Sequence, residues 1–94
     1  MRVPEITRNS VFGTFIRKFI KNNEWIVKVL EIGSGSGNGS TQCFIESLVE
    51  RKDSVLYCIE TNEEWYSDLV ENTKEYSFVF STKSEYHSSL VSIQ

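Results

Sequence analysis

The sequence predicts an α/β fold that forms one half of a doubly wound parallel sheet, with a helix placed before it. Three observations carry this prediction. Residues 10–22 show the apolar stripe of a helix. Residues 27–84 alternate between short apolar runs and stretches with helical spacing, in the order β-α-β-α-β. Alternating glycines begin at Gly33, directly after the first apolar run, where a strand gives way to a helix.

The size and charge of the chain narrow the classes of protein to consider. Ninety-four residues with 39% hydrophobic composition indicate a single globular domain. The net charge of −3, without a basic cluster, argues against nucleic acid as a partner. The longest apolar run, Val55 to Ile59, is far shorter than the roughly 20 residues of a membrane span. Because the first five residues also lack the apolar core of a signal peptide, we expect no membrane partner.

The cysteines and the single histidine indicate neither a disulfide nor a metal site. Cys43 and Cys58 stand among apolar residues inside expected elements, a setting typical of reduced core thiols in a cytoplasmic protein. Cys58 has no basic neighbour in the sequence to lower its pKa, so we expect it to be inert. His87 has no second His or Cys at ligand spacing, so we expect no metal.

The first element is a helix over residues 10–22, which Asn9 or Ser10 can cap. Its apolar residues fall on one stripe and comprise Val11, Phe12, Phe15, Ile16, Phe19 and Ile20. We therefore expect this stripe to face the core.

The rest of the chain divides into three strands, two helices and a tail. Strands are expected at 27–32, 54–60 and 77–81, and helices at 40–51 and 63–75. In the first strand, apolar residues point to both faces, which is typical of a strand covered by helices on each side. Residues 85–94 form a serine-rich tail, for which a short helix and disorder both stay open.

The order of the elements also predicts the sheet and the place of a ligand. Right-handed crossovers between parallel strands give the spatial order 3-2-1. In such a sheet, ligands bind beyond the carboxyl ends of the strands. The glycine loop, Glu60 and residues 81–84 all follow strands and are expected at this edge. A carboxylate at the position of Glu60 can accept hydrogen bonds from the two hydroxyls of a ribose.

The glycine spacing separates the candidate ligands. A phosphate-binding P-loop is rejected, because no lysine follows Gly39. The dinucleotide pattern Gly-x-Gly-x-x-Gly would require a glycine at Asn38, so NAD is the second choice. The serines among the glycines of residues 33–39, and His87 after Glu60 in the order of a hydrolase triad, raise a hydrolase as a further candidate, but a Gly-x-Ser-x-Gly elbow would need serine where Gly35 stands. The short spacing and the glycine-rich loop disfavour this hydrolase interpretation.

The glycine loop, its preceding acidic residue and the acid after the second strand resemble a known family. Glu31, Gly33, Gly35 and Gly37 match the first motif of the class I S-adenosylmethionine-dependent methyltransferases, and Glu60 matches the second. The resemblance covers residues 10–84 and corresponds to the N-terminal half of these Rossmann-like enzymes.

The resemblance implies a cofactor, S-adenosylmethionine, and a role for each matched residue. The loop backbone would approach the methionine part of the cofactor, Glu31 would orient the loop, and Glu60 would bind the ribose. Residues 61 and 62 would flank the adenine, and residues 82–84 occupy the place of a further adenine contact. The implied cofactor-binding residues are Glu31, Gly33, Ser34, Gly35, Gly37, Glu60, Thr61, Asn62 and Thr82.

Compared with the family, the chain lacks the half of the sheet that contributes substrate contacts. We therefore expect cofactor binding without methyl transfer by this chain alone, and no catalytic residue is assigned. An acceptor would be a small or sugar-like molecule. The edge of the strand over 27–32 is open and apolar, so a second copy or a complementing chain could pair there. A non-catalytic oligomerising module and an NAD-binding fragment remain the alternatives.

Overall fold

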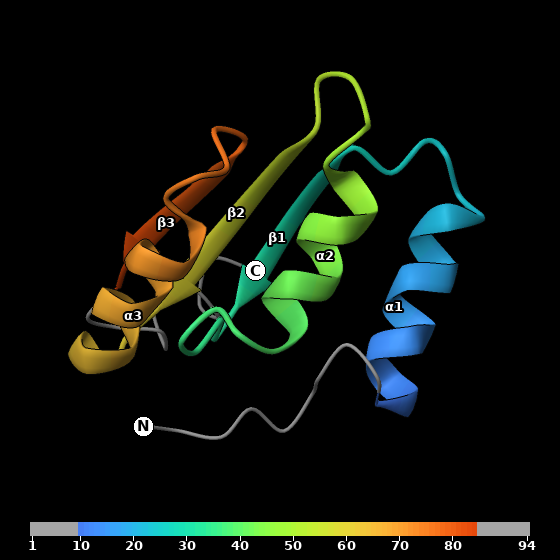
Figure 1. Ribbon diagram of the computed structural model, residues 1–94. Helices are drawn as coiled ribbons and strands as arrows, with labels where there is room; N and C mark the ends of the chain where they lie inside the picture. Colours follow the sequence, from blue (N-terminus) through green and yellow to red (C-terminus); the bar gives the residue numbers. More distant parts are fainter. Residues whose placement is uncertain (1–9, 85–94) are drawn as a thin grey trace, which may run out of the picture.

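The computed structural model describes residues 10–84, which form one three-stranded sheet and three helices (Figure 1). The element order agrees with the predicted one. The elements are α1 (Val11–Lys21), β1 (Lys28–Ile32), α2 (Ser40–Leu48), β2 (Val55–Glu60), α3 (Glu63–Thr73) and β3 (Val79–Lys83). The tail prediction for residues 85–94 lies outside the described residues.

The strands pair in parallel in the order β1-β2-β3, which confirms the predicted sheet. The register aligns Leu30 with Tyr57 and Phe80, and Ile32 with Ile59 and Thr82. Because successive strand residues point to opposite faces, each of these two rows lies on one face of the sheet.

The third strand lies two residues later than predicted. Residues 77 and 78 belong to a turn, in which the Val79 N–H donates to the Tyr76 carbonyl oxygen at 3.1 Å. The strand then continues to Lys83, which pairs with Glu60. Main-chain pairing with β2 therefore extends β3 over polar residues, which the apolar pattern alone does not predict to be part of a strand.

The described helices all cover one face of the sheet. Figure 1 shows α2 and α3 in front of the strands and α1 beside α2. The buried core lies between these layers and comprises Ile16, Ile20, Cys43, Ile45, Leu48, Leu56, Cys58 and Leu69. On the other face, Leu30 and Ile32 are 57% and 55% exposed. The expectation that helices cover β1 on both sides is therefore wrong for the described part of the chain.

Only two of the six apolar residues in the stripe of α1 reach the core. The Ser10 side chain caps the helix by accepting from the Gly13 N–H at 3.0 Å, as predicted. Ile16 and Ile20 are buried, but the other apolar residues of the stripe, Val11, Phe12, Phe15 and Phe19, are exposed. The three phenylalanine rings instead stack on one another, with centroids 6.0 and 5.8 Å apart. Within residues 10–84, α1 packs chiefly against α2, which covers only part of the stripe.

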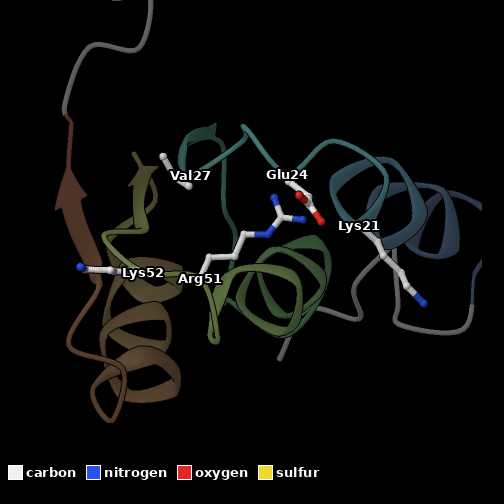
Figure 2. A pocket seen from close by; sticks show the side chains of 5 residues that line it. All are labelled: Lys21, Glu24, Val27, Arg51 and Lys52. Atoms are coloured by element: carbon white, nitrogen blue, oxygen red, sulfur yellow. The ribbon is translucent and has the colours of Figure 1, made fainter.

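Arg51 ties α1 and the following loop to the rest of the domain. Its guanidinium donates to the carbonyl oxygens of Ile20, Asn23 and Ile26 at 2.5, 3.0 and 2.7 Å. Arg51 lines a hollow of about 470 Å³ together with Lys21, Glu24, Val27 and Lys52. Figure 2 shows these five side chains. Since Val27 and Lys52 precede β1 and β2, this hollow lies at the opposite end of the sheet from the glycine loop. None of the three helices described is long and apolar enough to cross a membrane.

Candidate functional site

The glycine loop between β1 and α2 needs its glycines for its backbone conformation. Gly33, Gly35 and Gly37 have φ values of +77°, +64° and +82°, a region that residues with a Cβ avoid. The N–H groups of Gly33 and Ser34 donate to the Ile59 carbonyl oxygen at 2.8 and 3.1 Å, which fixes the start of the loop against β2. The loop is therefore a defined turn at the carboxyl end of the sheet, as predicted.

Two of these glycines have different surroundings. A Cβ at Gly33 would meet no atom within 4 Å, so the backbone there faces open space. A Cβ at Gly37 would lie 2.9 Å from Leu69 Cδ1 and 3.5 Å from Leu69 Cα, because the loop packs directly against α3. Gly33 thus leaves room for a ligand, whereas Gly37 is required by packing. A cofactor contact at Gly37 stays a prediction.

Glu60 joins the end of β2 to the glycine loop. Its side chain is 4% exposed, and its Oε1 accepts from the Gly35 N–H at 2.7 Å. Its Oε2 accepts from the N–H groups of Thr61 and Asn62 at 3.0 and 2.9 Å. The fold therefore brings together the loop and the acid that the sequence places 25 residues apart. A carboxylate has about four acceptor positions, so these three donors leave capacity for one more.

Glu31 ties the end of β1 to the first turn of α2. It is 8% exposed and accepts hydrogen bonds from the hydroxyls of Ser40 and Thr41. A carboxylate at a helix N-terminus is favoured by the positive end of the helix dipole. Both hydroxyls belong to the residues directly after the loop. Glu31 thus holds the end of the loop, which is the arrangement that its predicted orienting role requires.

Ser34, Thr61 and Asn62 all lie around the loop and the end of β2. The buried Ser34 hydroxyl donates to the Glu31 carbonyl oxygen at 3.3 Å. Thr61 is half-buried. The Asn62 side chain accepts from the Trp65 N–H at 2.9 Å and caps α3. Their backbone and side-chain groups shape the site, and their contacts to a cofactor stay predictions.

Thr82 lies apart from the Glu60 side chain. It is exposed and shares a row with Ile59 on the uncovered face of the sheet. The residue opposite Glu60 is Lys83, whose Nζ lies 3.8 Å from Glu63 Oε1. The structure therefore places Thr82 at the carboxyl edge but not on the face that holds Glu60.

Two amide side chains that the sequence did not single out hold the loop. Asn72 Nδ2 donates to the Ser36 carbonyl oxygen, and Gln42 Nε2 donates to the Gly37 carbonyl oxygen, both at 2.8 Å. No local pattern marks Asn72, because its contact crosses 36 residues. Its position three residues after Leu69, on the face of α3 that meets Gly37, is a property of the tertiary structure.

Cys58 is not a nucleophile. Burial and the nearby Glu31 carboxylate raise the pKa of its thiol from 9.0 to about 12, so the reactive thiolate is absent near neutral pH. Glu31 Oε1 lies 3.9 Å from the Cys58 sulfur. Within residues 10–84, no three His, Cys, Asp or Glu side chains gather as metal ligands would. His87, the histidine of the hydrolase alternative, lies beyond this range.

Comparison with known proteins bears on the fold. No family model matches the chain, and no curated protein matches it. Among solved structures, the SAH-bound methyltransferase PaMTH1 from Podospora anserina matches with a TM-score of 0.71. The match has 19% sequence identity and covers 88% of this chain but only 36% of PaMTH1. At this identity the likeness establishes the fold, and it confirms the Rossmann-like α/β arrangement. The chain thus has the fold of part of a methyltransferase, spanning about a third of the length of that enzyme.

Proposed function

We propose that this chain binds S-adenosylmethionine through the glycine loop and Glu60. The observation that carries the proposal is the 2.7 Å hydrogen bond from the Gly35 N–H to Glu60 Oε1. It sets a loop of positive-φ glycines against a buried acid at the next strand tip, at the edge where open α/β sheets bind ligands. The fold likeness to an SAH-bound methyltransferase supports this choice of ligand.

Within this proposal the residues divide into those that contact the cofactor and those that hold the site. The open space at Gly33 admits the methionine part against the bare backbone. Glu60 accepts a ribose hydroxyl with its remaining acceptor position, and it stays aimed because three N–H groups hold it. Thr61 and Asn62 flank the adenine, whereas Thr82, on the other face of the sheet, is not part of this set. Glu31 acts on the loop through α2.

The charges around the loop favour a sulfonium cofactor over NAD. Glu31 and Glu60 are both buried beside the loop, and Gln42 and Asn72, which donate hydrogen bonds to loop carbonyl oxygens, are uncharged. Negative charge here repels a pyrophosphate and attracts the cationic sulfur of S-adenosylmethionine. The missing glycine at position 38 points the same way. We therefore expect NAD not to displace S-adenosylhomocysteine.

We further propose that methyl transfer requires more polypeptide than this chain provides. Transfer depends on holding donor and acceptor in line, and the chain spans 36% of the methyltransferase that it resembles. The outer edge of β1 is the place where a complementing strand would pair. The acceptor is a small or sugar-like molecule rather than nucleic acid, since the chain has a net charge of −3. The cytoplasm is the proposed compartment, because both cysteines are buried thiols.

The test is calorimetric titration of the full chain with S-adenosylhomocysteine. Glu60→Gln keeps the side-chain shape but loses the charge, and we expect it to weaken binding by about tenfold or more, as for a charged hydrogen bond. Glu64→Gln is the matched control, because Glu64 is an exposed glutamate in the first turn of α3, four residues after Glu60. A folded wild-type chain that gives no heat with the ligand, or equal binding by both variants, contradicts the proposal.

A further inference from the structure

The two halves of the glycine loop are held by different parts of the molecule. The first half, residues 33–35, lies against β2, where its N–H groups donate to the Ile59 carbonyl oxygen and to the Glu60 carboxylate. The second half, residues 36 and 37, has two carbonyl oxygens that accept from side chains of α3 and α2 instead. The sheet therefore places the first half of the loop, whereas the helices place the second half.

Asn72 makes the longer-range of the two contacts to the second half. Its Nδ2 donates to the Ser36 carbonyl oxygen at 2.8 Å, across 36 residues of sequence. We call this hydrogen bond the clamp. Three residues earlier on α3, the fully buried Leu69 packs against Gly37. Gln42, by contrast, is only five residues from the Gly37 carbonyl that it binds. One turn of α3 thus supports the loop by packing and holds it by the clamp.

The planarity of the peptide bond connects the clamp to the rest of the loop. Each peptide group is planar and trans, so a fixed Ser36 carbonyl also fixes the Gly37 N–H on the opposite side of the same plane. That N–H donates to the Ser34 carbonyl oxygen at 3.3 Å and closes the turn. Inside this turn, the Gly35 N–H donates to Glu60 at 2.7 Å. The clamp is therefore linked through the turn to the acid of the proposed cofactor site.

We propose that Asn72 is a positioning residue for the cofactor: the clamp holds the glycine loop in its binding conformation before the cofactor arrives. This inference rests on the function proposed above. Glycines give a loop many accessible conformations, and the apparent affinity for a ligand falls with the fraction of molecules in the binding conformation. Loss of the clamp lowers this fraction and weakens binding, because Asn72 acts on the loop and not on the ligand.

Amide hydrogen exchange of the full 94-residue chain measures the opening of the loop without any ligand. In Asn72→Ala we expect the Gly35 N–H to exchange on the order of tenfold faster, as for one lost hydrogen bond. Ser54→Ala is the matched control. The buried Ser54 hydroxyl also donates to a main-chain carbonyl, that of Leu48 at 2.9 Å, but it lies before β2, at the other end of the sheet. We expect this control to leave the exchange of the Gly35 N–H unchanged.

Calorimetric titration with S-adenosylhomocysteine measures the consequence for binding. We expect Asn72→Ala to raise the dissociation constant roughly threefold to tenfold, and Ser54→Ala to leave it unchanged. Asn72→Asp keeps the shape of the side chain but turns a carboxylate oxygen toward the Ser36 carbonyl oxygen. Because two acceptors cannot share a hydrogen bond, this variant should weaken binding at least as much as Asn72→Ala. Circular dichroism confirms that each variant is folded.

Three results would overturn the positioning role of Asn72. The first is an unchanged exchange rate of the Gly35 N–H in Asn72→Ala, and the second is an equal acceleration by Ser54→Ala. The third is binding of the ligand by Asn72→Ala or Asn72→Asp as strongly as by the wild-type chain, which leaves the proposed function standing. A wild-type chain that binds no ligand contradicts the proposed function instead, and the exchange of the Gly35 N–H then still decides whether Asn72 holds the loop.

Discussion

Gly33 and Gly37 form a matched pair that separates backbone strain from packing. Their φ values, +77° and +82°, are nearly the same, so an alanine at either position meets the same unfavourable backbone conformation. That term costs about 1–2 kcal/mol. Only Gly37 adds a steric term, since its new Cβ would lie 2.9 Å from Leu69 Cδ1.

The steric term at Gly37 is large because Leu69 has no room to move. Leu69 is fully buried in the core, and overpacking at such a site costs about 1–3 kcal/mol. We therefore expect Gly37→Ala to lower the free energy of unfolding by about 2–5 kcal/mol, as the sum of the two terms. Gly33→Ala loses only about 1–2 kcal/mol. For a domain of this size the larger loss is a substantial part of a total of roughly 5–15 kcal/mol.

Urea denaturation followed by circular dichroism measures the loss of unfolding free energy in both variants. Titration with S-adenosylhomocysteine measures how strongly each variant binds the ligand. Gly33→Ala puts a methyl group into open space at the proposed site, so we expect it to weaken ligand binding more than it weakens the fold. Gly37→Ala should do the reverse. Equal losses of unfolding free energy in the two variants would refute the assignment of Gly37 to packing. The assignment also fails if adding Leu69→Ala to Gly37→Ala does not reduce the loss of unfolding free energy that Gly37→Ala causes.

Three further predictions address the rest of the structure. Arg51→Met removes three hydrogen bonds to α1 and the loop after it and should cost about 3 kcal/mol of unfolding free energy, against almost nothing for the exposed Lys52→Met in the same denaturation assay. Asn62→Ala removes the cap of α3 and should cost about 1 kcal/mol, which thermal unfolding will detect beside Ser67→Ala as the control. Cys58, with its pKa raised from 9.0 to about 12, stays protonated in the folded chain after the unfolded thiol has ionised. The folded state then binds more protons, so stability falls between pH 9 and pH 12 by up to about 1.4 kcal/mol per pH unit. Unfolding at several pH values should show this part of the slope absent from Cys58→Ala, and identical slopes would contradict it.

The elements and the site motif could be read from the sequence because their signals are local. Apolar periodicity reports the difference between strand and helix within one element, and it placed all six elements of the described chain in the right order. The glycine loop and Glu60 were recognisable because a turn with positive φ needs glycine at particular positions. Parallel pairing then forces the loop and the end of β2 to one edge, so their contact follows from topology.

What the sequence determined by itself is the order of strands and helices, the conformation of the glycine turn and the edge at which Glu60 meets it. Tertiary structure alone decided which apolar residues are covered. Phe12 and Leu30 have the same apolar character as Ile16 and Leu56, but only the latter two face a neighbouring layer. The tertiary structure also decided that Gly37 packs against α3 and that the Asn72 side chain holds the glycine loop by a hydrogen bond. The reason is that periodicity reveals which side of an element is apolar, whereas burial depends on whether another element lies there.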